Sequence, residues 1–129
     1  MFLGLRTVIY PMSDLDAAKA WFTKVLATEP NFDESFYVGF TVGGYELGLV
    51  PKRDDGSDNE PITYWGVANA DAGLAALIDA GAILRDEVTD VGGGIRVAAV
   101  REPGGNLVGV IENPHFTVAA TARSEGPGR

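Results

Sequence analysis

Glu46 is the candidate catalytic or ligand-binding carboxylate of this sequence. Residues 36–50 predict a β-hairpin whose two-residue turn is a glycine pair. The register of that hairpin places Glu46 opposite Thr41, on a face that also carries Tyr37. A carboxylate on such a face could accept a hydrogen bond from a ligand or act as a general base. The alternative is a solvated or salt-bridged side chain without a role.

Two tyrosines accompany this carboxylate. Tyr37 shares the face of Glu46, and Tyr64 lies in a second predicted strand, residues 62–68. A phenol combines an apolar ring with a polar tip, which suits the binding of an aromatic or amphipathic ligand. The same side chains could instead fill the interior, because a pocket and a filled core use the same residue types.

Arg96 is the candidate cation. In the hairpin that follows it, pairing Val100 with Leu107 places Arg96 on the same face as Gly109. There the guanidinium could bind a ligand carboxylate or pair with Glu46. The alternative is an arginine at a strand edge in water.

The composition excludes several classes of site and partner. The 129 residues contain no cysteine and one histidine, His115, so disulfides, thiolate sites and histidine-rich metal sites are excluded. The formal net charge of −8 disfavours nucleic acid as a partner, because binding to a phosphate backbone needs a basic face. Apolar runs are shorter than the ~20 residues that span a bilayer, and no leader pattern opens the chain. We therefore expect a cytoplasmic protein with no membrane or nucleic-acid partner.

The chain divides into two similar halves, at about residues 5–50 and 62–113. Each begins with a strand that leads to a helix, capped by Ser13 in the first half and by Asn69 in the second. A shift of 55 residues superimposes the two patterns, although the third strand of each half is unclear. We expect one domain, residues 1–116, built from two repeats, and a flexible tail at residues 117–129.

The paired pattern resembles the glyoxalase/bleomycin-resistance/extradiol-dioxygenase superfamily, also called vicinal oxygen chelate. The resemblance implies an α+β fold in which two βαβββ modules form a curved mixed sheet around a cup, usually in a homodimer. Whether the halves pair within one chain or across two is left open. Three segments carry the resemblance: Ser13-Asp14-Leu15 with Trp21-Phe22 before Lys24-Val25-Leu26; Gly43-Gly44-Tyr45-Glu46-Leu47; and Glu102-Pro103-Gly104-Gly105-Asn106.

Members of this superfamily often hold a divalent metal with one side chain from each of four strands. By resemblance, these positions fall on Thr7, Glu46, Ile62 and Gly109. Isoleucine and glycine have no ligating group, and threonine is a poor neutral donor. We therefore expect no metal and no cofactor. Whether the protein is an enzyme stays open, with Glu46 as the only catalytic candidate.

The leading hypothesis is a metal-free member of the superfamily that binds a small organic, apolar or aromatic molecule in the cup. Glycines on the presumed cup face favour open space. One alternative is a lyase, isomerase or dioxygenase of the superfamily, and another is a dimeric, non-catalytic module with a collapsed cup. The predicted ligand-binding residues are Thr7, Tyr37, Glu46, Tyr64, Arg96 and Gly109.

Overall fold

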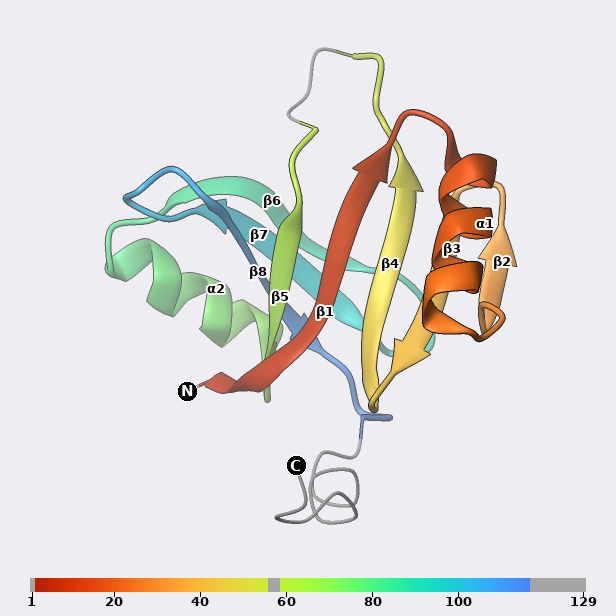
Figure 1. Cartoon of the computed structure of the whole chain (residues 1–129). Coiled ribbons are helices and arrows are strands. Elements are labelled where there is room, and N and C mark those ends of the chain that lie inside the picture. The colour runs from red at the N-terminus through yellow and green to blue at the C-terminus, as the bar shows by residue number, and fades with distance from the viewer. Residues whose placement is uncertain (1, 56–58, 117–129) are drawn as a thin grey trace.

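The computed structural model describes residues 2–55 and 59–116, and these form two modules of the same order. Figure 1 shows the modules side by side, each with one helix. The first comprises β1 (Phe2–Met12), α1 (Leu15–Leu26), β2 (Phe32–Glu34), β3 (Tyr37–Val42) and β4 (Tyr45–Pro51). The second comprises β5 (Ile62–Val67), α2 (Ala70–Asp79), β6 (Ile83–Asp90), β7 (Arg96–Arg101) and β8 (Leu107–Glu112).

One mixed sheet joins the two modules, and the described strands follow the order β2-β3-β4-β1-β5-β8-β7-β6. Within each module the first and last strands run parallel, β1 with β4 and β5 with β8. The modules meet where β1 pairs antiparallel with β5. The expected α+β fold of two βαβββ modules in a curved sheet is therefore confirmed, and the halves pair within one chain.

Helix α1 packs on the outer face of the first module. Asp14, rather than the expected Ser13, is the N-cap, because its Oδ1 accepts a hydrogen bond from the Ala17 N–H at 3.0 Å. The apolar side of the helix covers a buried cluster on β3 and β4. The core residues of this cluster are Val38, Phe40 and Leu49, and the helix residues against them are Leu15, Ala18, Phe22 and Leu26.

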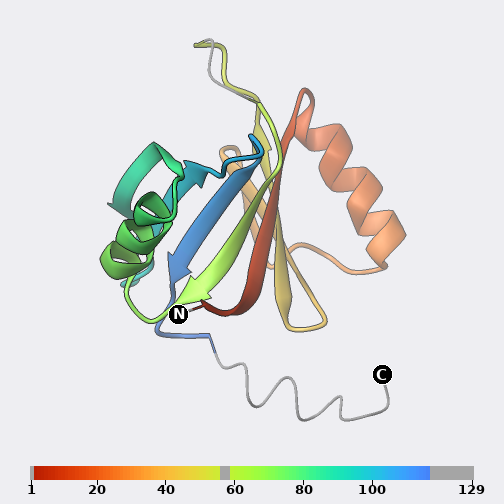
Figure 2. The same ribbon diagram turned by 90° about the vertical axis from the view of Figure 1, so that its left-hand side faces the viewer.

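Helix α2 covers the equivalent face of the second module. Asn69 caps it as expected, with its Oδ1 accepting from the Ala72 N–H at 2.8 Å. Leu74 and Leu77 pack on a buried cluster formed by Val67, Ala98 and Val110. Figure 2 shows that both helices lie outside the curved sheet, so the opposite, concave face is free to line a cup. Neither described helix is long and apolar enough to cross a bilayer.

Candidate functional site

Four residues form one row across the four central strands of the sheet. Thr7 on β1 pairs with Glu46 on β4 and, on its other side, with Tyr64 on β5. Tyr64 in turn pairs with Gly109 on β8. The parallel pairs Thr7–Glu46 and Tyr64–Gly109 are equivalent in the two modules, so this row crosses the centre of the cup.

A cavity of about 540 Å³ opens on this row. Thr7, Tyr37, Glu46 and Tyr64 all line it, so the structure brings together four of the six predicted ligand-binding residues. The common face of Tyr37, Glu46 and Tyr64 agrees with the strand alternation, and Thr7 lies where the resemblance implied. The binding role of all four stays a prediction. The remaining lining residues are Ile9, Asn31, Phe32, Phe36, Val91, Ile95, Val97, Ile111 and Asn113.

The Glu46 carboxylate is held by two hydroxyl groups. The Tyr37 hydroxyl donates to Oε2 at 2.6 Å, and the Thr7 hydroxyl donates to Oε1 at 3.3 Å. Burial and the hydrogen bond to Glu46 raise the pKa of Tyr37 well above its ordinary value. Burial likewise raises the pKa of Tyr64. The cup therefore combines one fixed carboxylate with two phenols that keep their protons.

Gly109 lies on the cup face, as expected, but it does not line the cavity. A Cβ atom at this position would overlap the ring of Tyr64, which covers the glycine. Gly48 is covered in the same way by the end of Tyr37. The expectation that glycines on the cup face leave open space is therefore wrong at Gly109 and Gly48, because the side chains of Tyr64 and Tyr37 already fill the space above them.

Arg96 does not reach the cup. Arg101 pairs with Leu107, so the β7–β8 register differs by one residue from the expected one and turns Arg96 to the opposite face. Arg96 there forms ion pairs with Asp71 at 2.8 Å and with Glu112 at 3.6 Å. Its predicted place beside Glu46 is wrong, and it joins the outer face of β7 to the start of α2.

His115 lies outside the residues that line the main cavity. Its Nε2 is 2.7 Å from the backbone oxygen of Gly93, so it links the end of β8 to the turn before β7. The expected flexible tail, residues 117–129, lies outside the described residues.

Arg6 is a cup residue that the sequence analysis missed. A β-bulge places it there, because β1 carries Arg6 as an extra residue between the pairs Leu5–Trp65 and Thr7–Tyr64. Simple alternation would put Arg6 and Thr7 on opposite faces, whereas both line a smaller pocket beside the main cavity. An arginine within an apolar strand was the available signal.

The apolar wall of the cavity was also missed. Phe32 and Phe36 lie on and beside the short edge strand β2, which the sequence pattern left unclear. Val97 faces the cavity because of the register that turns Arg96 outward. Asn31 and Asn113, in connecting segments, line both the main cavity and the smaller pocket.

Comparison with known proteins identifies the family. The model of the Glyoxalase/Bleomycin resistance protein/Dioxygenase superfamily matches residues 4–110, which is most of the chain. The chain belongs to this superfamily. No curated protein matches the sequence.

Solved structures share the superfamily fold at low sequence identity. A variant of Streptomyces coelicolor methylmalonyl-CoA epimerase, in complex with 2-nitronate-propionyl-CoA, has a TM-score of 0.73 and 17% identity, over 88% of this chain and 99% of that one. Methylmalonyl-CoA epimerase from Mycobacterium tuberculosis has a TM-score of 0.68 and 20% identity, over 92% and 93%. A superfamily member from Vibrio splendidus 12B01 has a TM-score of 0.64 and 17% identity, over 83% and 97%.

The side chains of the central row show whether this protein could bind the divalent metal ion that members of the superfamily often hold. The third position of the row is Tyr64, not the expected Ile62, which packs in the core two residues away. The 55-residue shift fails here because Thr7 lies seven positions before the helix cap Asp14, whereas Tyr64 lies five before Asn69. Tyr64 in place of Ile62 does not create a metal site, since a buried phenol that keeps its proton is a poor metal ligand.

The donor set of the row is one carboxylate, two neutral hydroxyl groups and a glycine. Both carboxylate oxygens already accept hydrogen bonds, from Tyr37 and Thr7. Residues 2–55 and 59–116 contain no cluster of three or more His, Cys, Asp or Glu side chains that could hold a metal ion. A divalent cation needs several anionic or imidazole ligands, so these residues do not fit the metal site of the superfamily.

Tyr37 should make stability depend on alkaline pH. Below its ordinary pKa of 10.0 the phenol is protonated in both states, and its hydrogen bond contributes fully. As the pH rises above 10, the unfolded chain loses the proton while the folded protein keeps it, so the free energy of unfolding falls. The variant Tyr37→Phe should be about 1–3 kcal/mol less stable than the wild type at pH 8, with a gap that narrows above pH 10. Urea unfolding from pH 8 to 10.5 measures the gap, and a constant gap would contradict the prediction.

Proposed function

We propose that this superfamily member binds a small organic, apolar or aromatic molecule in its cup without a metal ion. The observation that carries the proposal is the open cavity of about 540 Å³. Its volume is within the usual range for small-molecule sites, and an open cup disfavours the alternative of a collapsed, purely structural module. The resemblance to bleomycin-resistance proteins supports the same proposal, because a protein that sequesters a drug binds it by shape and stacking and needs no metal ion.

The cavity walls match such a ligand. Phe32, Phe36 and Val97 supply apolar contact, and the rings of Phe32 and Tyr37 meet edge to face with centroids 5.8 Å apart. Glu46 and Tyr64, which belong to the central row, add polar groups to the cavity lining. A few fixed polar groups in an apolar wall orient a ligand and provide specificity.

A neutral fluorescent aromatic, N-phenyl-1-naphthylamine, tests this binding. Wild-type protein should enhance its fluorescence in a saturable way. The variant Val97→Trp fills the cavity and should weaken binding about tenfold or more, because the added indole occupies the space of the probe. The matched variant Ile83→Trp places the same side chain at a position that is 71% exposed and should bind as the wild type does.

Two outcomes would contradict the binding proposal. The first is an absence of saturable enhancement in the wild type, and the second is equal affinity in both tryptophan variants. Thermal melts show whether each variant is folded. Metal analysis of protein purified without a tag completes the test. One equivalent of tightly held Zn, Ni, Fe or Mn at Glu46 would overturn the metal-free part of the proposal.

A second candidate is proton-transfer chemistry of the isomerase class. The fixed Glu46 carboxylate favours it, since a general base must be held beside its substrate with acids nearby. Tyr37 and Tyr64 are phenols that keep their protons, and two of the similar structures are methylmalonyl-CoA epimerases. Incubation with methylmalonyl-CoA in D₂O, followed by NMR, tests this candidate. Deuterium incorporation that is lost in Glu46→Gln would establish catalysis, and its absence from the wild type would remove this substrate.

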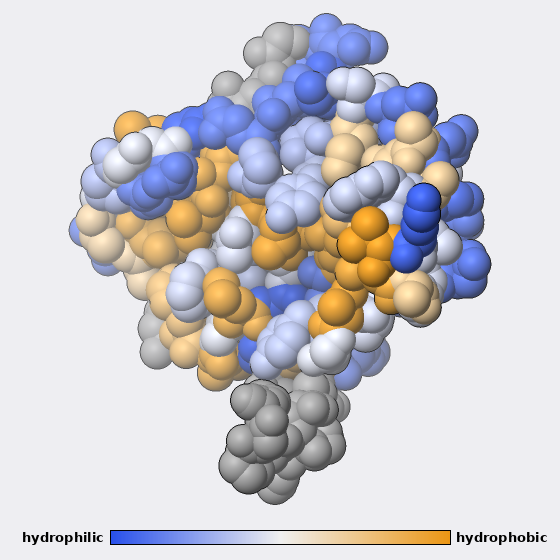
Figure 3. All heavy atoms as spheres, in the orientation of Figure 1, coloured by the Kyte–Doolittle hydropathy of each residue, from blue (hydrophilic) through white to orange (hydrophobic). Residues whose placement is uncertain are grey.

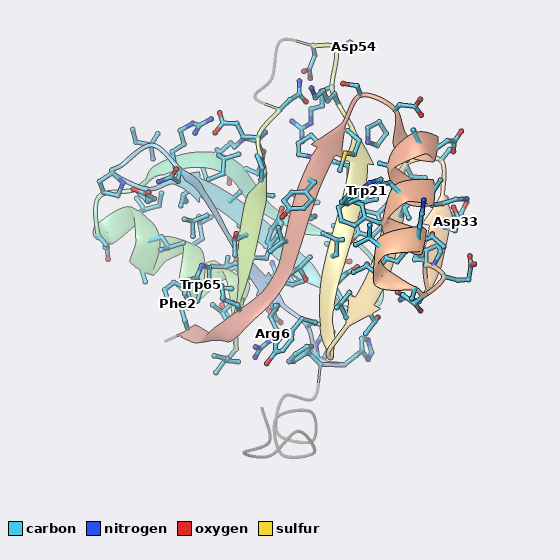
Figure 4. All side chains as sticks on the ribbon, in the orientation of Figure 1. Phe2, Arg6, Trp21, Asp33, Asp54 and Trp65 are labelled. Atoms are coloured by element: carbon cyan, nitrogen blue, oxygen red, sulfur yellow. The ribbon has the colours of Figure 1, made fainter. Side chains whose placement is uncertain are left out.

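We also propose that the protein forms a homodimer through its outer face. Large apolar side chains are exposed there, and Figure 3 shows hydrophobic residues on both sides of the central strands. Trp21 on α1 is 58% exposed, and Phe2 and Trp65 lie together at the other side of this face in Figure 4. Exposed apolar patches of this kind mark association surfaces.

Light scattering at micromolar concentration should report twice the chain mass. The variant Trp21→Glu should shift the protein towards the monomer, because it places a charge in the apolar face. Ala20→Glu, at an exposed position on another side of the same helix, should leave the mass unchanged. A monomeric wild type would contradict the proposed dimer.

A further inference from the structure

The Arg6 guanidinium is buried in the wall of the cup. Arg6 is only 7% exposed, because the bulge in β1 turns it towards Gly66 on β5. A Cβ atom at Gly66 would lie 2.6 Å from Arg6 Nε, and one at Gly4 would lie 3.2 Å from Nη1. Two glycines therefore leave the room that the guanidinium occupies. Figure 4 places Arg6 at the lower end of β1.

No carboxylate neutralises this buried charge within residues 2–55 and 59–116. The ion pairs among those residues do not include Arg6. Its contacts are a hydrogen bond from Nη1 to its own neighbour, the Leu5 backbone oxygen, at 3.1 Å, and the Phe116 ring, 4.1 Å from Cζ. Burial lowers the pKa of Arg6, yet an arginine stays charged at neutral pH. A buried charge normally requires a counter-charge, which here must come from outside these residues.

Arg6 lines a pocket of about 210 Å³ that adjoins the main cavity. The two spaces share Thr7, Glu46 and Ile111, together with Asn31 and Asn113, so one molecule can extend from the cavity into the pocket. The pocket thus joins the apolar cup to the unneutralised guanidinium.

Two amide groups that line this pocket with Arg6 donate no hydrogen bond within residues 2–55 and 59–116. Asn31 Oδ1 accepts from the Thr41 hydroxyl at 3.2 Å, and Asn113 Oδ1 accepts from the His115 N–H at 2.9 Å. Because both carbonyl oxygens are engaged, the two NH₂ groups remain to donate. One guanidinium and two amide donors around a small space form a set that matches an anionic acceptor.

We propose that this pocket is a carboxylate subsite, so that the ligand has an apolar or aromatic body in the cavity and a carboxylate on Arg6. This inference rests on the proposed binding function. A planar carboxylate matches the fork of a guanidinium with two parallel hydrogen bonds. Glu46 borders the same pocket, but its oxygens are directed to the hydroxyls of Tyr37 and Thr7.

A pair of ligands with the same body tests the subsite. Isothermal titration compares 2-naphthoate, which is anionic, with 2-naphthamide, which is neutral and of nearly the same shape. Wild-type protein should bind the naphthoate about tenfold more tightly or better. Equal affinities would overturn the carboxylate subsite and leave the proposed function intact, whereas no binding of either compound would overturn both.

Two variants locate the effect. Arg6→Met keeps the length of the side chain without its charge and should remove the preference for naphthoate while naphthamide still binds. Asn113→Asp keeps the oxygen that accepts from His115 but replaces the amide donors with a negative charge, and it should also remove the preference. Lys24→Met removes a positive charge at an exposed position on α1 and should change nothing.

Naphthamide binding and thermal melts show that each variant is folded. If Arg6→Met does not fold, Asn113→Asp still decides the question. A preference for naphthoate that survives in a folded Arg6→Met or in Asn113→Asp would overturn the assignment to this pocket.

Discussion

Gly109→Leu should lower the free energy of unfolding by about 3 kcal/mol or more, because it overpacks the centre of the cup. A Cβ atom at Gly109 would overlap Tyr64 Cδ1 and lie 3.0 Å from Cγ. Cγ is the base of the ring, so Tyr64 cannot swing away without leaving its rotamer. Urea or thermal unfolding measures the loss.

A comparison of Gly109→Ala with Gly48→Ala tests whether the clash with the base of the Tyr64 ring causes this loss of stability. At Gly48 the added Cβ meets the far end of Tyr37, which can turn aside at the expense of its hydrogen bond to Glu46. The alanine at Gly109 should therefore cost more than the alanine at Gly48. The substitution Tyr64→Ala should relieve most of the effect of Gly109→Leu in the double variant. A Gly109→Leu protein as stable as the wild type would show that the space above Gly109 is open.

Phe40→Ala should lower the free energy of unfolding by about 3–5 kcal/mol, the usual range for a buried phenylalanine. Phe40 has no exposed surface, and its ring centroid lies 6.4 Å from that of Phe22 on α1. None of the α1 side chains is itself fully buried, so the helix depends on this cluster of β3 and β4 residues. In the Phe40→Ala variant, backbone amide hydrogen exchange should therefore rise more in α1 than in α2, relative to the wild type.

Val42→Ala is the control on the same strand. Val42 is 42% exposed at the end of β3, and its truncation should cost less than about 1 kcal/mol. If Phe40→Ala and Val42→Ala lose similar amounts of unfolding free energy, the prediction is contradicted. An equal rise of amide exchange in α1 and α2 of the Phe40→Ala variant would also contradict it.

Local features of the sequence determined the repeats and the first half of the site. The glycine pair of the β3–β4 turn has positive φ at both positions, and the strands alternate from it, so Thr41 pairs with Glu46 as expected. Tyr37 and Glu46 then share a face, because the side-chain period of a strand is two. Asn69 likewise caps α2 through a contact three residues away. Each of these features depends only on neighbours in the chain.

The tertiary structure alone decided the features that depend on how separate strands align. One residue of register between β7 and β8 turned Arg96 outward, and an unequal distance between strand and helix moved the central row from Ile62 to Tyr64. The bulge that brings Arg6 into the cup arises only when β1 pairs with β5. A change of register by one residue exchanges the two faces of a strand, and the amino-acid sequence of the strand does not reveal it. The sequence therefore determined the modules and the Tyr37–Glu46 pair, while contacts between distant strands decided which other side chains face the cup.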